Sequence, residues 1–133
     1  MSKNLDLVRS ILAAQARGDF GSTEWAHPDI EFVVADGPSP GIWKGRAGMA
    51  AGIRDFQDTW EEYRVEVDEY RELDDERVLV LIRRSGRGKA SGLELGQMGA
   101  KGAGLFHVRG GEVTRLVRYW DRARALADLG LEE

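Results

Sequence analysis

Asp121 is the residue of this sequence best placed to do chemistry. It follows a stretch, residues 112–120, in which apolar side chains occupy both parities, as in a strand covered on both faces. A carboxylate held in an apolar site is a candidate general acid or base. It is also a candidate N-cap, because aspartate caps helices well and a helical pattern begins at Arg122. The sequence leaves both roles open, and one residue can fill both.

Two further polar side chains are candidates for the same site. Tyr119 shares the parity of Asp121, so we expect both side chains on one face of the sheet, where the phenol can orient the acid or donate to a substrate carbonyl. The alternative is a core tyrosine. His107 lies on a predicted strand and is expected to point into a cavity, whereas His27 is expected to satisfy backbone groups nearby. Two histidines and scattered acids lack metal-ligand spacing, so neither a metal nor another cofactor is predicted.

Large aromatic side chains recur through the first half of the chain. Each of them is either part of the core or part of the lining of a pocket. Phe56 and Trp60 end an apolar stripe with helical spacing, which fits a buried face and a pocket roof equally well. Trp43 follows a loop rich in glycine and proline and is either a core residue or a lid. The predicted lining of an apolar, substrate-binding pocket is Trp25, Phe32, Trp43, Phe56, Trp60 and His107.

Periodicity and turn residues predict the elements that position these side chains. We expect a first helix that Asn4 caps and Gly18 ends, a short helix at residues 22–26, and a main helix at 46–60. Basic residues at 83–89 are interpreted as a solvated strand end. Gly110-Gly111 is expected to turn the chain into the last strand, and Gly130 to end a terminal helix. The predicted strands are residues 29–34, 63–73, 78–82, 93–108 and 112–120.

This order of elements predicts an α+β architecture. We expect a curved antiparallel sheet that forms a cone, closed by three N-terminal helices and followed by a short C-terminal helix. With 133 residues the chain is expected to form one domain, residues 1–133.

Composition excludes several classes of protein. Hydrophobic residues make up 42% of the chain and charged residues 32%, which is typical of a folded domain. The formal net charge of −4 argues against a nucleic-acid partner. The sequence has no cysteine, and it shows neither a signal-peptide pattern nor an apolar run that could span a membrane. We therefore expect a soluble cytoplasmic protein.

Four stretches resemble the SnoaL-like members of the nuclear transport factor 2-like superfamily. They are HPDIEF (27–32), GIWKGRAGM (41–49), GRGKASGLEL (86–95) and VRGGEVTRLVRYWDRARALADLGL (108–131). The resemblance implies the cone-shaped fold and a homodimer. It also implies, from small polyketide cyclases, that Asp121 acts as general acid/base in an aldol ring closure. Ketosteroid isomerases share the fold, but their general base lies near the end of the first strand, where this chain has Phe32, Val33 and Val34.

These observations give a leading hypothesis and a rival. The first is a SnoaL-like protein that binds a small apolar organic ligand and transfers a proton next to a carbonyl, in a cofactor-independent cyclisation or isomerisation. Asp121 and Tyr119 are then its polar, catalytic residues. The rival is a non-catalytic ligand-binding or dimeric interaction module of the same fold.

Overall fold

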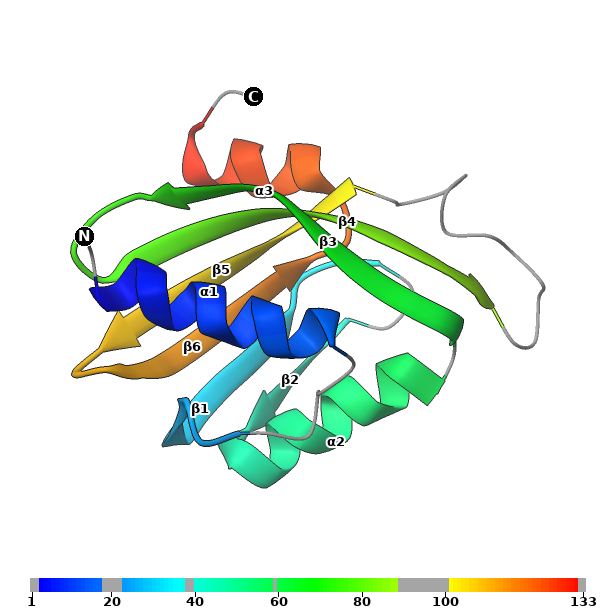
Figure 1. The fold of residues 1–133 in the computed structure, drawn as a ribbon, viewed down its shortest axis with the longest axis horizontal. Coiled ribbons are helices and arrows are strands. Elements are labelled where there is room, and N and C mark those ends of the chain that lie inside the picture. Colours follow the sequence, from blue (N-terminus) through cyan, green and yellow to red (C-terminus); the bar gives the residue numbers. More distant parts are fainter. Residues whose placement is uncertain (1–2, 18–22, 38–39, 59, 89–100, 132–133) are drawn as a thin grey trace.

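A computed structural model of the protein describes residues 3–17, 23–37, 40–58, 60–88 and 101–131, and these residues form an α+β fold. Its strands make one curved sheet with the order β2-β1-β6-β5-β4-β3 (Figure 1). The helices are α1 (Lys3–Ala16), α2 (Gly45–Asp58) and α3 (Arg122–Leu129). The strands are β1 (Ala26–Val34), β2 (Gly41–Lys44), β3 (Trp60–Glu72), β4 (Arg77–Gly88), β5 (Lys101–Arg109) and β6 (Glu112–Tyr119).

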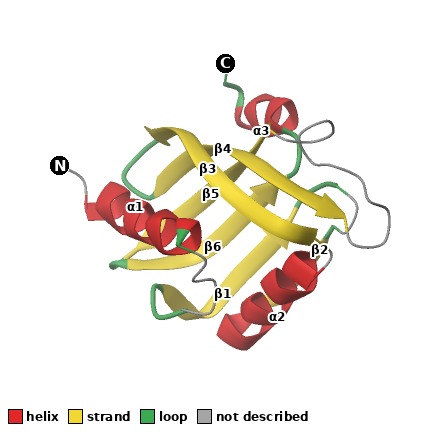
Figure 2. Cartoon of the chain, turned by 45° about the vertical axis from the view of Figure 1, so that its right-hand side comes forward, coloured by secondary structure: helices red, strands yellow, loops and turns green. Residues whose placement is uncertain are grey.

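The two faces of the sheet carry separate apolar clusters. The larger cluster joins α1 and α2 to one face, and the smaller joins α3 to the other (Figure 2). Strand β4 contributes to both, because Val78 and Val80 belong to the first cluster and Leu79 and Leu81 to the second. This confirms the prediction that the strand at residues 78–82 is buried on both faces.

Local signals predicted the end of the chain well. Gly110 and Gly111 make the hairpin turn between β5 and β6, with φ angles of 60° and 81° that favour glycine. Gly130 ends α3 with φ 68°. Asn4, in contrast, lies inside α1, and its side-chain amide donates to the Asp75 carbonyl at 2.6 Å instead of capping the helix. Gly18 lies outside the described residues.

The described residues form two N-terminal helices rather than the three predicted. Residues 24–25 of the expected short helix form a turn, Ala26 begins β1, and residue 22 lies outside the described part of the chain. Two physical reasons explain the error. Pro28 restricts the residue before it to extended conformations, and the backbone N–H of Val113 donates to the Trp25 carbonyl at 2.9 Å, which ties this segment to β6.

The sheet is mixed rather than wholly antiparallel, because β1 pairs with β6 in parallel. Strand β2 was not predicted, since four residues are too few for a period. It pairs with β1 so that Trp43 lies beside Phe32. The main helix ends at Asp58, and Trp60 starts β3. Of the strand expected at 93–108, the described part is within β5. No described helix is long and apolar enough to cross a membrane.

Candidate functional site

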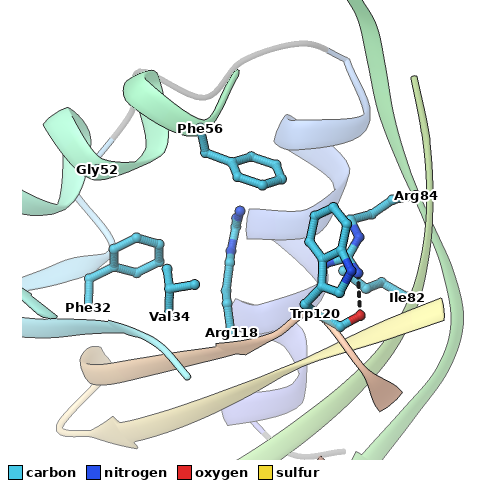
Figure 3. A pocket seen from close by; sticks show the side chains of 8 residues that line it. All are labelled: Phe32, Val34, Gly52, Phe56, Ile82, Arg84, Arg118 and Trp120. Carbon is cyan, nitrogen blue, oxygen red and sulfur yellow. Dashed lines mark hydrogen bonds between the residues drawn. The ribbon is translucent and has the colours of Figure 1, made fainter. Parts of the chain in front are cut away.

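A cavity of about 30 Å³ lies between α2 and the sheet, and we call it the α2 cavity (Figure 3). This volume holds about two water molecules, so a ring-sized ligand enters only if side chains move. Strands β1, β4 and β6, together with Trp120 directly after β6, supply the rest of its wall. The lining residues are Phe32, Val34, Gly52, Phe56, Ile82, Arg84, Arg118 and Trp120.

Aromatic rings form much of this wall. Trp120 and Phe56 meet edge to face, with ring centroids 6.1 Å apart and an interplanar angle of 73°. Phe32 packs against Trp43 at 5.6 Å. Trp43 stands behind the wall, against α2, and Gly52 makes this possible, because a Cβ there would lie 2.9 Å from the Trp43 ring. The cavity therefore offers flat apolar surfaces suited to a planar ligand.

Arg84 places a buried guanidinium at one side of the cavity. Only 5% of the residue is exposed, and its guanidinium carbon lies 4.4 Å from the centroid of the Trp120 ring. It also donates to the Trp120 carbonyl, drawn as a dashed line in Figure 3. Gly102 leaves room for it, since a Cβ there would lie 2.9 Å from the guanidinium carbon and 2.6 Å from the Tyr119 carbonyl oxygen. Arg84 is thus fixed in place by packing.

Arg118 brings a second guanidinium into the cavity. It rises from β6, and Figure 3 shows its side chain extending between Val34 and Trp120 toward Phe56. Its guanidinium carbon lies 5.6 Å from the centroid of the Phe32 ring. A guanidinium carries five N–H donors and binds carboxylate or enolate oxygens strongly in apolar surroundings. Arg118 is therefore the polar group best placed to orient a ligand here.

The structure places Tyr119 outside the lining of the α2 cavity, although the sequence predicted it as a polar contact of the ligand. Residues on β6 alternate between faces, so Arg118 and Trp120 face α2, whereas Tyr119 packs beneath α3 with Ala125 and Leu126. Burial, followed by the charge of Asp128, raises the pKa of the Tyr119 phenol. The alternative of a core tyrosine is the one that the structure shows.

Asp121 caps α3 with its side chain. The carboxylate accepts a hydrogen bond from the backbone N–H of Ala123 at 3.1 Å, and the residue is exposed. The N-cap interpretation is thus confirmed. The described lining of the α2 cavity does not include Asp121.

Of the other residues that were predicted to line the pocket, some lie in the wall of the α2 cavity and some lie elsewhere. Phe32 and Phe56 line the α2 cavity, while Trp25 packs at the edge of the larger apolar cluster. The side chain of Trp60 lies outside the described part of the chain. His107 alternates with Phe106 along β5 and so faces away from the α2 side, and burial, followed by the Arg115 charge, lowers its pKa.

His27 follows the sequence-based expectation, because its Nδ1 accepts from the backbone N–H of Asp29 at 3.0 Å. Among the described residues, no group of three histidine, aspartate or glutamate side chains could hold a metal ion.

Sequence reasoning missed Arg84, Arg118 and Trp120. Arg84 was interpreted as part of a solvated strand end, yet it is buried. One signal was available for Arg118: it stands between Val117 and Tyr119 in a strand covered on both faces, where a charged side chain needs a reason. The parity that Arg118 shares with Trp120 then defines the face that borders the cavity.

The sequence and the fold match those of a known family. The chain belongs to the SnoaL-like domain family, whose profile matches residues 8–116. No curated protein matches the chain significantly.

Solved structures confirm the NTF2-like fold. An NTF2-like protein of unknown function from Burkholderia pseudomallei is 26% identical with a TM-score of 0.77, over 96% of this chain and 97% of that one. TerC, co-crystallised with polyporic acid, is 23% identical with a TM-score of 0.74, over 96% and 98%. A candidate polyketide cyclase from Sinorhizobium meliloti is 20% identical with a TM-score of 0.65, over 85% and 93%.

Proposed function

We propose that this SnoaL-like protein binds a small, largely apolar organic ligand in the α2 cavity and holds an anionic or carbonyl oxygen of that ligand at Arg118. The observation that carries the proposal is a guanidinium extended into a wall that is otherwise mostly aromatic and aliphatic. Ligand sites of this kind are mainly apolar and use a few polar groups to fix orientation.

The wall chemistry favours a planar ligand with an acidic group. Phe56 and Trp120 offer ring faces and edges, and Arg118 supplies paired donors that match the two oxygens of a carboxylate. The co-crystal of TerC with polyporic acid supports this class of ligand, because that protein shares the fold.

Catalysis is the finer part of the proposal. Proton transfer next to a carbonyl, in a cyclisation or isomerisation, builds negative charge on oxygen, and a guanidinium at that oxygen stabilises it. Asp121 as general acid/base stays a prediction from the resemblance. The described lining of the α2 cavity contains no carboxyl or imidazole group, which favours ligand binding over acid/base chemistry as the primary function.

Calorimetric titration with naphthoate and its uncharged amide, naphthamide, tests the binding proposal. We expect wild type to bind naphthoate about tenfold more tightly, because a charge-assisted hydrogen bond contributes about 1.5–3 kcal/mol. Arg118→Gln should lose this preference, and Arg118→Lys should keep part of it.

Arg115→Gln is the matched control for charge. Arg115 lies on the same strand with the opposite parity, is half exposed, and pairs with Glu31 at 3.4 Å. The Arg115→Gln variant should bind naphthoate as tightly as wild type does. Equal losses in the Arg115 and Arg118 variants, or no preference for naphthoate in wild type, would overturn the proposal.

We propose in addition that the protein is a homodimer, as its resemblance to the superfamily implies. Light scattering at micromolar concentration should then give twice the mass of one chain. The mass of a single chain would refute it.

A further inference from the structure

The α2 cavity is too small for a ring-sized ligand, so a side chain of its wall has to move before such a ligand enters. Its volume of about 30 Å³ holds about two water molecules, which is much less than an aromatic ring requires. The wall residues differ in how firmly the structure holds them. These differences identify the side chain that moves.

The strand residues of the wall with apolar side chains are held on several sides. Phe32 is only 2% exposed and packs against the Trp43 ring. Ile82 is also buried, and Val34 lies in a strand that pairs with a neighbour on each side. Isoleucine and valine are β-branched, which restricts their rotation about χ1. Movement of any of these three side chains would disturb the sheet or the core.

Trp120 is fixed at its backbone and at its ring. Its N–H donates to the Asp36 carboxylate at 2.7 Å, and its carbonyl accepts from the Arg84 guanidinium, which also lies over its ring. An outward movement of the tryptophan would break these contacts and leave the buried guanidinium of Arg84 without them. Gly37 packs so closely that a Cβ there would lie 2.9 Å from the Trp120 Cβ. The indole therefore belongs to the fixed part of the wall.

Phe56 differs from these residues in its position and its exposure. It lies two residues before α2 ends at Asp58, and it is partly exposed to solvent. Hydrogen bonds at a helix end open at low cost, and a helical phenylalanine has two common χ1 rotamers. Its ring meets Trp120 edge to face, with centroids 6.1 Å apart, and Figure 3 shows the Arg118 side chain extending toward it. The ring can therefore move, and it lies near the guanidinium that the ligand has to reach.

We infer that Phe56 is the gate of the α2 cavity: its ring turns outward to admit the ligand and turns back to cover it. The inference rests on the proposed function and adds to it the step that controls entry. In the free protein, the Phe56 ring and the Arg118 side chain occupy space that the ligand takes. The association rate then depends on the fraction of molecules in which the gate is open.

Arg118 is a second side chain of the wall that can move, and kinetics distinguish the two residues. Arg118 holds the bound ligand, so its loss should act mainly on the dissociation rate. A gate acts on the association rate, because every ligand has to pass it before any contact with the guanidinium forms. Separate measurement of the two rates therefore assigns the two roles.

Stopped-flow kinetics with naphthoate measure both rates. We expect Phe56→Ala to raise the association rate constant about tenfold, which corresponds to a gate that is open in about a tenth of wild-type molecules. Phe56→Leu should raise the constant less, and Phe56→Trp, with a larger ring, should lower it. Thermal melting checks that each variant is folded. The leucine and tryptophan variants keep the test decisive if the alanine variant does not fold.

Phe32→Leu is the matched control, because it removes a ring from the fixed part of the same wall. This variant should raise the dissociation rate constant of naphthoate without raising the association rate constant. Arg118→Gln should also raise the dissociation rate constant alone, and by a larger factor.

The outcomes separate the gate from the proposed function. If naphthoate binding depends on Arg118 but Phe56→Ala changes only the dissociation rate constant, the gate is refuted and the proposed function stands. An equal rise in the association rate constants of Phe56→Ala and Phe32→Leu would show that any enlargement of the cavity admits the ligand, which also refutes the gate. If naphthoate binds neither wild type nor the Phe56 variants, the proposed function fails and the gate fails with it.

Discussion

The Asp36 carboxylate accepts a hydrogen bond from the backbone N–H of Trp120 at 2.7 Å, which fixes the pocket tryptophan from the loop after β1. Its second oxygen accepts from the N–H of Asp121 at 3.2 Å. Gly37 follows in the chain with φ 93°, a conformation that favours glycine. A Cβ at this position would also lie 2.9 Å from the Trp120 Cβ, so the close approach of Trp120 requires glycine here. A carboxylate far away in sequence thus secures the junction between β6 and α3.

We predict that Asp36→Asn lowers the free energy of unfolding by about 1 kcal/mol and Asp36→Ala by about 2 kcal/mol, because the amide keeps one acceptor oxygen and alanine keeps none. Both variants should also weaken naphthoate binding, because Asp36 holds Trp120, which lines the α2 cavity. Urea unfolding and calorimetry measure these effects. Asp29→Asn, an exposed change on β1, is the control and should be neutral. Stability unchanged in Asp36→Ala would show that these hydrogen bonds are not required.

Asp121→Asn should melt at the same temperature as wild type, because asparagine and aspartate cap helices equally well. Asp121→Ala should lose about 1 kcal/mol, or about 3–5 °C, because the bond to the Ala123 N–H is removed. Both variants should bind naphthoate normally. A raised melting temperature in Asp121→Asn would instead indicate an acid retained for chemistry. Turnover of a discovered substrate that survives in Asp121→Ala would refute the general acid/base role.

The parts of the fold that the sequence predicted are those that local physics determines. The cap at Asp121, the end of α3 at Gly130 and the turn at Gly110-Gly111 each depend on a few neighbouring residues. Strand β2 and the parallel pairing of β1 with β6 depend on tertiary contacts, which no short pattern contains.

The candidate site was harder to predict because β6 is buried on both faces. In a strand with one apolar face, periodicity alone identifies the side that meets the core. Here Leu116 and Val117 are both buried, so the pattern does not say which parity borders the cavity. The sequence-based prediction chose the parity of Tyr119 and Asp121. The structure instead places Arg118 and Trp120, which have the other parity, in the wall of the α2 cavity. Phe32 and Phe56 do line the α2 cavity, and a single apolar stripe defines the face of each, while their contact with a ligand stays a prediction.

Asp68 is expected to make stability depend on pH. A hydrogen bond from Arg122, at 2.8 Å, is the main cause that lowers the pKa of the Asp68 carboxyl, and the Arg83 charge adds to it. Because the folded pKa is lowered, this stabilisation is present above the ordinary carboxyl pKa and is lost as pH falls through the lower folded pKa. Asp68→Asn should therefore flatten the fall in unfolding free energy between about pH 5 and about pH 3.

Urea unfolding between about pH 5 and about pH 3 compares the unfolding free energies of wild type and Asp68→Asn. The same Arg122 side chain donates to the Ile82 carbonyl at 2.8 Å, so Arg122 ties α3 to β3 through Asp68 and to β4 through Ile82. At neutral pH we expect Asp68→Asn to cost about 1 kcal/mol, since Asp68 is partly exposed to solvent. Glu66→Gln, on the same strand and exposed, should keep the wild-type slope. A parallel pH profile in Asp68→Asn would disprove the assignment.

Gly102→Ala should be the most damaging of these changes. Its Cβ would lie 2.6 Å from the Tyr119 carbonyl oxygen and 2.9 Å from the Arg84 guanidinium, both of which are held in place by the sheet and by packing. Overpacking of this kind costs about 1–3 kcal/mol. Gly104→Ala is the matched control on the same strand, because its Cβ makes only ordinary contacts. Urea unfolding should show a loss in the first variant alone. Equal stability of the two would mean that Arg84 leaves its buried position at little cost, and the wall of the α2 cavity would then be far more mobile than its packing indicates.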